Sequence, residues 1–583
     1  MPTLNWIGRK AVENHHKQVP FHLLKEAPEL SVGDPGSGNL LVEGDNLLAL
    51  KALLPYYSGQ VKCIYIDPPY NTGNENWIYN DNVNSPEMKE WLGKVVGKEA
   101  EDLTRHDKWL CMMYPRLLLL RKFLDRIGVI MVSIDDAEVT NLRILMDEIF
   151  GRDNFVAQLI WEKGRKNDAK LFSIGHEYVI VYARSVSYLK QNNISWREEK
   201  PGAKEIHDEY LRLKEVLGND WHGIEIALRD FYKKLPKGHP SKKHSRYGNV
   251  DANGVWRDDN MSWPGGGGPR YDVIHPVTGK PCAVPEGGWR YATLVKMNDM
   301  IAKGVVQFRD TEKEPPIRKT YLVRGNDDNE ENIDEEDIGR QVMGSYFYRS
   351  ALQASNTLLS IFGKKIFENP KDHDILARLI RYVTNDDKNA TILDSFAGSA
   401  TTGHAVLNLN KEDSGNRRFI LVELDKKIAR EISTVRLRSV IDGYRNLKDE
   451  TVAGLGGGFR FATLGEPLFD ENGNIRSSVR FADLARHVYF IEMGEPLPKQ
   501  AKTNSPLIGT CNGVAVYLLY NGILKDKTPD GGNVLTTSIL AHLNKHNGPK
   551  VIYGTACRIG LERLRRENIV FKQLPYKLRV GAL

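Results

Sequence analysis

Short apolar runs between residues 39 and 185 alternate with longer segments in which apolar residues recur at helical spacing. The runs at 40–42, 61–66, 129–134, 155–161 and 178–182 predict strands, and the segments 47–54, 109–127 and 139–150 predict helices. Strands that alternate with helices are typical of a parallel α/β sheet. We therefore predict an α/β core that begins near residue 39.

The same alternation returns late in the chain, after a long stretch without it. Residues 186–350 show little periodicity, whereas helices are predicted over 374–383 and 426–441 and strands over 391–393 and 419–422. A glycine-rich stretch at 454–458 is typical of a linker, and the rest mixes strand-like runs such as 514–519 with a basic helix at 558–566. We predict an arm at 1–38, a core split into 39–185 and 351–448, an insert at 186–350, and a smaller α+β domain at 449–583.

Composition narrows the class of protein. The 583 residues are too many for one hydrophobic core, and the 41% hydrophobic and 27% charged residues are typical of a soluble globular protein. The longest apolar runs, 117–120 and 129–132, are too short to span a bilayer, and the first ten residues lack a signal-peptide segment. The five cysteines form no CxxC pair and the fifteen histidines no HExxH pattern. We expect a cytoplasmic protein with no membrane span and no metal site.

A glycine-containing turn follows the predicted strand 391–393 and opens a helix. It reads Asp394-Ser395-Phe396-Ala397-Gly398-Ser399-Ala400-Thr401-Thr402-Gly403. Glycines at such a turn let a ligand approach the backbone and the helix N-terminus. Glu423 ends the next predicted strand, twenty positions past Gly403, where an acid can accept hydrogen bonds from both ribose hydroxyls. The pattern predicts a nucleoside site on a Rossmann-like sheet, and a tight turn without any ligand is the alternative.

The residue in the middle of this turn bears on which nucleoside fits. Ala400 stands where the dinucleotide pattern Gly-x-Gly-x-x-Gly has the glycine that admits a pyrophosphate close to the backbone. This weakens an interpretation as an NAD oxidoreductase, whereas S-adenosylmethionine has no pyrophosphate and makes no such demand. The chain also contains no Gly-Lys-Ser/Thr phosphate loop, which argues against a built-in ATPase.

A second turn, Asp67-Pro68-Pro69-Tyr70, follows the apolar strand 61–66, and ligands bind at such strand ends in open α/β sheets. The Asp67 carboxylate and the Pro68 carbonyl can accept hydrogen bonds from the two N–H groups of an exocyclic amine, which frees its lone pair for attack. The two prolines fix the loop in advance, and Tyr70 offers a flat face on which a flipped-out base can stack. The alternative is a surface turn, because Asp-Pro and Pro-Pro are common turn formers.

Together these turns carry a family resemblance. Asp67-Pro68-Pro69-Tyr70 resembles motif IV of amino-methyltransferases, and Phe396-Ala397-Gly398-Ser399 resembles their cofactor motif I. The catalytic motif comes first, as in the β class of DNA methyltransferases, in which a target-recognition insert lies between the two halves. The class implies a circularly permuted, Rossmann-like, S-adenosylmethionine-dependent methyltransferase sheet. An Asp in the first position favours adenine N6, because cytosine N4 enzymes typically carry Ser there.

The size, the stretch Gly44-Asp45-Asn46-Leu47-Leu48-Ala49-Leu50 and the extra C-terminal domain are most similar to the modification subunit of type III restriction-modification systems. That resemblance implies site-specific transfer of a methyl group from S-adenosylmethionine to adenine N6 in double-stranded DNA by base flipping. It also implies a separate ATP-dependent restriction subunit and leaves open whether the chain forms a homodimer.

The resemblance assigns roles residue by residue. Asp67, Pro68, Pro69 and Tyr70 would form the catalytic turn that holds the target adenine. The cofactor site would comprise Asp45, Asn369, Lys371, Asp394, Phe396, Ala397, Gly398, Ser399, Thr401 and Glu423. Among these, Asp45 would reach the adenine of the cofactor, and Asn369 and Lys371 lie in Phe367-Glu368-Asn369-Pro370-Lys371, which resembles motif X. Ser395 and Ala400 depart from the usual Pro and Gly of motif I, so we expect an altered turn geometry.

Aromatic and basic residues interleave in the insert and make it a candidate nucleic-acid interface. We predict contacts from Trp289, Arg290, Lys242 and Lys243, because such mixtures suit phosphate and base contacts. Ordinary core tryptophans explain the pattern as well, and the net charge of +6 fits either a polyanionic partner or a solvated surface.

Three other functions stay open at this point. The same core could methylate RNA or a protein amide, although the protein enzymes resemble Asn-Pro-Pro-Tyr at this turn. The chain could be a DNA-specificity subunit that has lost catalysis, or an NAD oxidoreductase. The intact Asp67 to Tyr70 turn argues against the former, and Ala400 against the latter.

Overall fold

The computed structural model of the protein describes residues 4–72, 90, 93–94, 104–164, 171–324, 339–385, 387–498, 505–520 and 532–575. The chain forms two compact units. We call Met1–Ser195 together with Gly344–Leu583 the core unit, and Trp196–Met343 the insert unit. Each unit contains its own clusters of buried apolar side chains, so each is stabilised by packing within itself.

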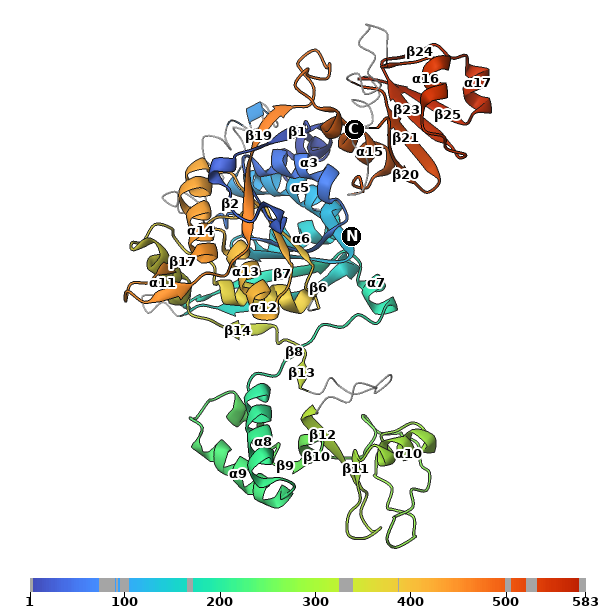
Figure 1. Ribbon diagram of the computed structural model, residues 1–583. Helices are drawn as coiled ribbons and strands as arrows, with labels where there is room; N and C mark the ends of the chain where they lie inside the picture. Colours follow the sequence, from blue (N-terminus) through green and yellow to red (C-terminus); the bar gives the residue numbers. More distant parts are fainter. Residues whose placement is uncertain are drawn as a thin grey trace. The chain divides into compact units, whose positions relative to one another are not determined.

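One large sheet runs through the core unit (Figure 1). Its 11 strands among the described residues follow the order β1-β19-β3-β16-β15-β4-β5-β7-β6-β14, with β2 beside β19. Their bounds are β1 His22–Glu26, β2 Val32–Gly33, β3 Leu40–Glu43, β4 Val61–Ile66, β5 Leu124–Ile134, β6 Phe155–Glu162, β7 His176–Ala183, β14 Tyr346–Tyr348, β15 Thr391–Asp394, β16 Arg418–Glu423 and β19 Gly458–Pro467. The neighbours from β19 to β5 are parallel, whereas β7 is antiparallel to β5 and β6. The predicted Rossmann-like α/β sheet is confirmed.

The two halves of this sheet interleave. Strands β15 and β16, which come late in the chain, lie between the early strands β3 and β4. Ile392 of β15 pairs with Cys63 of β4, and Ile420 of β16 pairs with Leu40 of β3. The two turns that stand far apart in the sequence therefore follow adjacent parallel strands, at the same edge of the sheet.

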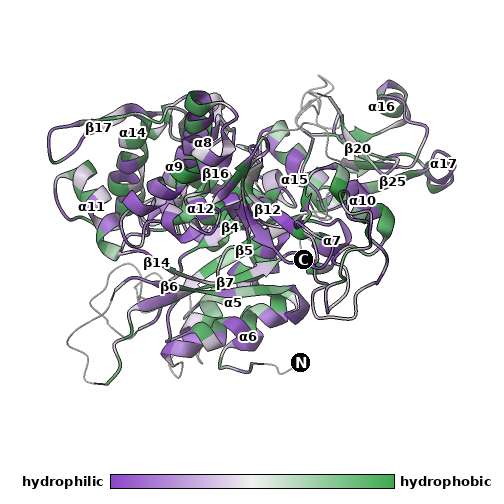
Figure 2. Cartoon of the chain, turned by 90° about the horizontal axis from the view of Figure 1, so that it is seen from below, coloured by the Kyte–Doolittle hydropathy of each residue, from purple (hydrophilic) through white to green (hydrophobic). Residues whose placement is uncertain are grey.

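Helices cover this sheet. The longer helices of the core are α3 Asn46–Tyr57, α5 Arg105–Phe123, α6 Val139–Phe150, α11 Ala351–Phe362, α12 His373–Val383, α13 Thr401–Asp413 and α14 Thr434–Asp442, and shorter ones are α1 Arg9–Val12, α2 His15–Gln18 and α7 Val186–Gln191. In α6, Leu142, Leu145, Met146 and Ile149 are buried at the spacing of one helix face. Figure 2 accordingly shows both hydrophobic and hydrophilic colours on this helix.

The chain before residue 39 and after residue 450 takes part in the core sheet. Strand β1 pairs antiparallel with β19, through Leu24 and Leu464, and β2 pairs with the start of the same strand. Strand β19 in turn pairs parallel with β3, through Phe461 and Leu41. Residues 454–457 of the stretch predicted as a linker form no helix or strand, but Gly458 already begins this core strand, so the stretch joins two parts of the core unit. The segment predicted as an arm contributes two strands.

Two predicted helices differ from the observed ones. The helix predicted over 109–127 ends at Phe123, and the strand predicted from 129 begins at Leu124. The helix predicted over 426–441 starts as a π-helical turn, Ile428–Ser433, before α14 continues it. Periodicity did not place the boundary between α5 and β5, because the apolar residues on its two sides, Phe123 and Leu124, are buried in the same cluster.

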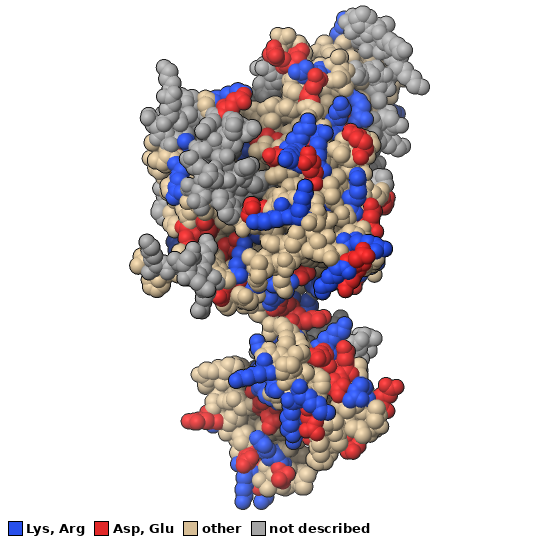
Figure 3. Space-filling model, turned by 90° about the vertical axis from the view of Figure 1, so that its left-hand side faces the viewer, with Lys and Arg blue, Asp and Glu red and all other residues tan. Residues whose placement is uncertain are grey.

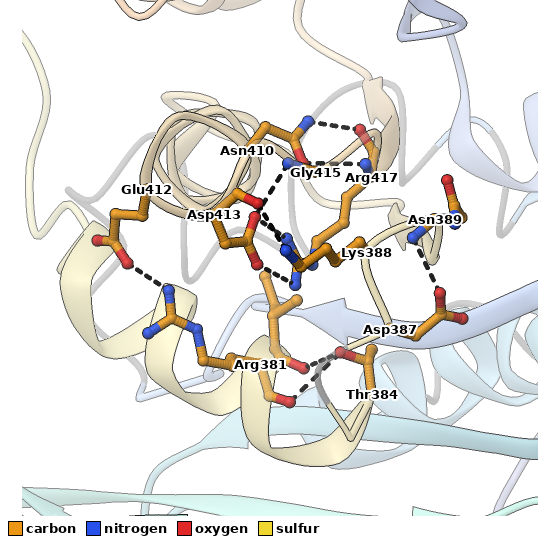
Figure 4. A network of polar contacts seen from close by, with 11 residues as sticks. Arg381, Thr384, Asp387, Lys388, Asn389, Asn410, Glu412, Asp413, Gly415 and Arg417 are labelled. Atoms are coloured by element: carbon orange, nitrogen blue, oxygen red, sulfur yellow. Dashed lines mark hydrogen bonds and ion pairs between the residues drawn. The ribbon is translucent and has the colours of Figure 1, made fainter. Parts of the chain in front are cut away.

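A polar network joins α12, α13 and the starts of β15 and β16 (Figure 4). The side chain of Arg417 is fully buried and forms two hydrogen bonds with the carboxylate of Asp413, at 2.8 and 2.9 Å. Lys388 donates to the Asp413 carbonyl at 2.7 Å, and Arg381 forms an ion pair with Glu412. These contacts fix the amino ends of β15 and β16, so the opposite, carboxyl ends are held in register.

A second, smaller sheet follows in the C-terminal part of the core unit. It contains β20 Leu507–Cys511, β21 Val514–Leu518, β23 Lys550–Gly554 and β25 Ile569–Gln573 in that order, and two-stranded pieces are β22 Val534–Leu535 with β24 Ala556–Cys557 and β17 Gly443–Arg445 with β18 Thr451–Ala453. Helix α15 Phe481–Met493 packs Leu484 and Val488 on one face, while α16 Thr537–His542 and α17 Leu561–Arg566 lie on the other. The predicted strand near 514–519 is confirmed.

The insert unit is more regular than its sequence indicates. It contains α8 Ala203–Leu217, α9 Trp221–Lys234, α10 Leu294–Ala302, a sheet of order β11-β12-β10-β9, and the short pair β8 Glu198–Glu199 with β13 Arg340–Gln341. The sheet strands are β9 Asn249–Asp251, β10 Gly254–Asp259, β11 Val306–Gln307 and β12 Ile317–Arg324. The apolar face of α8 consists of Ala203, Ile206, Tyr210 and Leu213. Because these four apolar residues are surrounded by many charged ones, the helical period of α8 was not evident in the sequence.

Candidate active site

The two turns singled out in the sequence meet at the carboxyl edge of the core sheet. Strand β4 ends at Ile66 and is followed by Asp67, and the neighbouring parallel strand β15 ends at Asp394. Ligands bind at this edge in open α/β sheets. A hollow of about 320 Å³ opens between the turns, and its lining is Tyr65, Asp67, Phe367, Asn369, Lys371, Leu376, Asp394, Phe396, Ala397, Gly398, Ser399, Thr401 and Thr402.

Helix α5 holds the Asp67 to Tyr70 turn in place through a hydrogen bond. The indole Nε1 of Trp109, in α5, donates to the Pro69 carbonyl at 2.6 Å. Pro68 is buried, and within the described part of the chain no group donates to its carbonyl oxygen. The Tyr70 hydroxyl lies 2.9 Å from Asp67 Oδ1 and can donate to it. The turn is thus rigid, and among the described residues its Pro68 carbonyl is an acceptor without a donor.

A buried ammonium group compensates the charge of this turn. Nζ of Lys371 lies 2.8 Å from Asp67 Oδ1 and 2.8 Å from the Tyr70 hydroxyl. On the other side it lies 3.4 Å from Glu177 Oε2, and the same oxygen accepts from Lys163 Nζ at 2.6 Å. The four charged side chains alternate in sign, from Asp67 through Lys371 and Glu177 to Lys163, and Tyr70 joins them in one connected network in which Lys371 is only 5% exposed.

The network shifts the protonation equilibria of its members. Burial would lower the pKa of Lys371, but the carboxylates of Asp67 and Glu177 outweigh it and raise this pKa above its ordinary value. Burial would raise the pKa of Glu177, yet Lys163 and Lys371 lower it. Burial raises the pKa of Tyr70 well above its ordinary value, and the Asp67 charge adds to this. The hydroxyl therefore stays protonated and serves as a donor.

Glu177 and Lys163 were not predicted from the sequence. Glu177 is an acid inside β7, an otherwise apolar strand, and Lys163 directly follows β6. A charged residue on a buried strand is unusual and was the signal available. Its partner could not be named, because the pairing register of β6 and β7 decides which side chains meet.

The second turn binds the carboxylate of Glu423 through its own backbone. The Gly398 N–H donates to Glu423 Oε2 at 2.8 Å, and the Asp425 N–H donates to Oε1 at 2.8 Å. Ala400, which replaces the usual glycine, has a left-handed φ of +62°. This conformation costs a non-glycine residue about 1–2 kcal/mol. The altered residue therefore keeps the glycine-type backbone conformation instead of changing it.

Asp394 is the buried carboxylate of this turn. Its oxygens accept from the Thr402 hydroxyl at 2.6 Å and from the Phe396 N–H at 3.0 Å. Burial raises the pKa of Asp394 to about 7, and the charge of Asp67 adds to the rise, while these two donors oppose it. No lysine or arginine among the described residues forms an ion pair with it.

Beneath the second turn lies a buried guanidinium group. Nη1 of Arg436 donates to Ser399 Oγ at 2.9 Å and to Thr401 Oγ1 at 2.8 Å. Beside it, His404 stacks on His373 with ring centroids 4.0 Å apart. Burial lowers the pKa of Arg436 to about 9, because no carboxylate of the described residues pairs with it. His404 thus packs against a neighbouring ring at the start of α13.

Two predicted cofactor residues do not line the hollow. Asp45 caps α3 by accepting from the N–H groups of Leu47 and Leu48, and its second oxygen pairs with buried Arg116 at 3.2 Å. Glu423 is 1% exposed. The other predicted residues that line the hollow are Asp67, Asn369, Lys371, Asp394, Phe396, Ala397, Gly398, Ser399 and Thr401, whereas Pro68, Pro69 and Tyr70 are not among its lining residues.

The four insert residues predicted to contact nucleic acid have different environments. Trp289 is completely buried, and its Nε1 donates to the Tyr271 carbonyl at 2.7 Å. This burial corrects the expectation for Trp289, because a core side chain presents no surface to a ligand. Lys242 donates to the Leu235 carbonyl at 2.6 Å and so caps the end of α9. Lys243 is exposed and Arg290 is partly exposed.

The His, Cys, Asp and Glu residues in the described part of the chain include no group of three that could hold a metal ion. None of its helices combines the length and the apolar character that a membrane span requires.

Comparison with known proteins places this edge of the sheet in context. Residues 61–434 match the N6/N4 DNA methylase family. The Mod subunit of the type III restriction-modification enzyme EcoP15I from Escherichia coli is 32% identical over 440 residues, which cover 73% of this chain and 64% of that protein. The Mod subunit of the type III enzyme StyLTI from Salmonella typhimurium is 31% identical over 608 residues, covering 93% and 83%. The solved M1.HpyAVI–SAM complex aligns with a TM-score of 0.27 at 12% identity, covering 68% and 98%.

Proposed function

Because this chain belongs to the N6/N4 DNA methylase family, we propose that it transfers a methyl group from S-adenosylmethionine to the N6 amine of adenine in duplex DNA. The observation that carries the proposal is the rigid Asp67 to Tyr70 turn, whose Asp67 lines the same hollow as the second turn. The Asp in its first position favours adenine over cytosine N4.

The residues of the first turn prepare the amine. Asp67 and the Pro68 carbonyl accept hydrogen bonds from its two N–H groups, which directs the lone pair away from the ring. Tyr70 provides a face for the flipped base, and Lys371 holds both Tyr70 and Asp67 in place. The amine becomes acidic only as the new bond forms, so Asp67 acts as an acceptor and not as a strong base.

The second turn fits a positively charged nucleoside. S-adenosylmethionine would supply a sulfonium methyl, which is a good electrophile. Among the described residues Asp394 is buried with neutral donors alone, so a cationic ligand would provide the counter-charge that this carboxylate lacks. Phe396, Ala397, Gly398, Ser399 and Thr401 line the same hollow and would hold the cofactor, with Asn369 and Lys371 opposite. Glu423 would bind the ribose after a small movement, and we keep Asp45 as a contact to the cofactor's adenine.

We further propose that the chain is the modification subunit of a type III restriction-modification system, in which the insert reads the target sequence. Its similarity to the two Mod subunits supports this. Restriction would then require a separate ATP-dependent subunit, since the sequence contains no phosphate loop. DNA cleavage by the purified chain alone would contradict this proposal.

The reaction can be tested with unmethylated plasmid DNA, RNA and bulk protein offered in parallel with labelled S-adenosylmethionine. We expect label in DNA alone, as N6-methyladenine after digestion to nucleosides. Asp67→Ala should lower the single-turnover rate by about a hundredfold to a thousandfold, as loss of one preorganised polar group does elsewhere. Cofactor affinity should change much less. N4-methylcytosine as the product, or a wild-type rate for Asp67→Ala, would refute the proposal.

A further inference from the structure

A second hollow, of about 730 Å³, lies within the insert unit and is lined by polar side chains. Five of them are cations: Lys200, Arg246, Arg257, Arg318 and Lys319. No Asp or Glu belongs to the lining among the described residues, although Figure 3 shows both signs of charge interspersed over the visible surface. So one-sided a lining concentrates positive potential in one place.

Among the described residues, carboxylates outside the lining approach two of these five cations. Lys319 pairs with Asp251 at 2.7 Å, and Arg257 approaches Asp259 at 3.5 Å. Arg318 is 8% exposed, and within the described part of the chain its guanidinium forms no hydrogen bond or ion pair. Isolating a charge from water without a partner is costly, so a nearly buried, unpaired guanidinium is suited to bind an anion.

His244 also lines the hollow, and the positive charges around it affect its pKa. Burial lowers the pKa of His244, and the charges of Lys200, Arg246 and Lys243 lower it further, against a hydrogen bond to the Pro201 carbonyl. The hollow also lies beside the short strand pair β8 and β13. Lys200 directly follows β8 and Gln341 ends β13, the paired strands through which the chain enters and leaves the insert unit.

The walls favour a phosphate over a nucleobase. Guanidinium groups match the tetrahedral oxygens of phosphate with paired donors. The two tyrosines of the lining, Tyr247 and Tyr321, are each only 2% exposed, so neither offers an open ring on which a base could stack. We propose that this hollow binds a backbone phosphate of the DNA substrate. The inference rests on the proposed function as a DNA methyltransferase and assigns an anchoring site to its insert.

Full-length variants can test this site by fluorescence anisotropy with a labelled, mixed-sequence, unmethylated duplex over a range of salt concentrations. Arg318→Met keeps the volume and removes the charge, and Arg246→Ala removes an exposed cation whose loss the fold should tolerate. Arg229→Ala is the matched control, because Arg229 is an exposed arginine of the same unit that pairs with Glu225 outside the hollow.

We expect DNA affinity to fall about tenfold to a hundredfold for Arg318→Met, as for loss of a charged hydrogen bond. The slope of log affinity against log salt should decrease by about one, because one fewer phosphate is neutralised. Arg246→Ala should change both in the same direction, whereas Arg229→Ala should not. The melting temperature of Arg318→Met should stay equal or rise, since an uncompensated buried charge is removed.

The opposite results are equally clear. If both hollow variants keep wild-type affinity and salt slope while the wild-type chain methylates DNA, this inference is wrong and the proposed function stands. If calorimetry shows inorganic phosphate or ATP bound by wild type and lost in Arg318→Met, with DNA affinity unchanged, the hollow serves a free anion and the inference is again wrong. If the wild type methylates no DNA, the proposed function itself fails.

Discussion

Asp67 directly follows β4 and Asp394 ends the neighbouring parallel strand β15, and both line the same hollow, yet their surroundings differ in charge. Asp67 has a buried ammonium group, Lys371, at 2.8 Å. Among the described residues Asp394 has only a hydroxyl and a backbone N–H as partners, and burial raises its pKa to about 7. The charge of Asp67 is therefore neutralised by a cation of the protein itself, whereas among the described residues the charge of Asp394 is not.

This difference separates two tasks. A catalytic acceptor has to be in place before the substrate arrives, so the chain supplies its counter-charge permanently. A carboxylate that awaits a cationic ligand is stabilised only when that ligand binds, and this adds to affinity. The same contrast appears in the cations: Lys371 lies between two carboxylates, whereas Arg436 under the second turn bonds mainly to hydroxyls.

The largest effect should come from making Asp67 resemble Asp394. Lys371→Met removes the cation that lies between Asp67 and Glu177. It also removes the hydrogen bond that Lys371 donates to the Tyr70 hydroxyl. We expect the single-turnover methylation rate to fall about a hundredfold to a thousandfold. The free energy of unfolding in urea should fall by about 3–5 kcal/mol, as when one partner of a buried pair is removed. Lys365→Met, at a 67% exposed surface pair, is the control, and a wild-type rate for Lys371→Met would refute this account.

The next effect concerns the other acid of the second turn. Glu423→Ala removes the acceptor of the Gly398 N–H and the proposed ribose ligand. Cofactor affinity in calorimetry should drop about tenfold to a hundredfold, because two charge-assisted hydrogen bonds are lost. Glu431→Ala, at an exposed position of the following helix, should bind like wild type. Equal affinity of both variants would remove Glu423 from the site.

A pH titration should sharpen the contrast further. Burial raises the pKa of Asp394 to about 7, so the group is largely neutral at pH 6 and charged at pH 8. Affinity for S-adenosylmethionine should therefore rise by about tenfold from pH 6 to pH 8. The free protein should show the reverse trend in stability: this contribution is fully present below the unfolded pKa near 4 and is lost as pH rises through 7. Asp394→Asn should flatten both profiles, and a steep profile in that variant would contradict the assignment.

The smallest effect is expected at Arg436. Its charge has no carboxylate partner among the described residues, so Arg436→Met loses hydrogen bonds to Ser399 and Thr401 but also relieves the burial of a charge. These terms oppose each other, and the free energy of unfolding should change by no more than about 1 kcal/mol. A loss as large as that of Lys371→Met in the same urea titration would show that the two cations are equivalent after all.

The sequence predicted those parts of the molecule that depend on local pattern. Strands such as 61–66 and 391–393 are continuous apolar runs, and each leads into a turn whose residue types have a chemical reason. The parallel α/β order followed from the alternation of strands and helices. Even the insertion between two halves of one sheet could be expected, because the same periodicity stopped and then returned.

What could not be predicted depends on contacts between distant segments. Glu177 and Lys163 reach the site only through the antiparallel register of β6 and β7. Trp289 has the same sequence surroundings whether it lies in a core or on a surface, and only packing around the sheet of the insert decides that it is buried. The glycine stretch before β19 has the composition of a linker, yet β3 offers an open edge that this strand completes.

The interleaved order of the core sheet also bears on how the protein is made. Strands β15 and β16 separate β3 from β4, and β19 covers β3 on its other side. A ribosome therefore releases the whole first half of the core, and then the insert, before the central strands exist. The insert unit has its own apolar clusters and can fold during that interval. The early strands must wait with unpaired edges, so a chain that stops before residue 467 would expose the apolar surfaces on which aggregation begins.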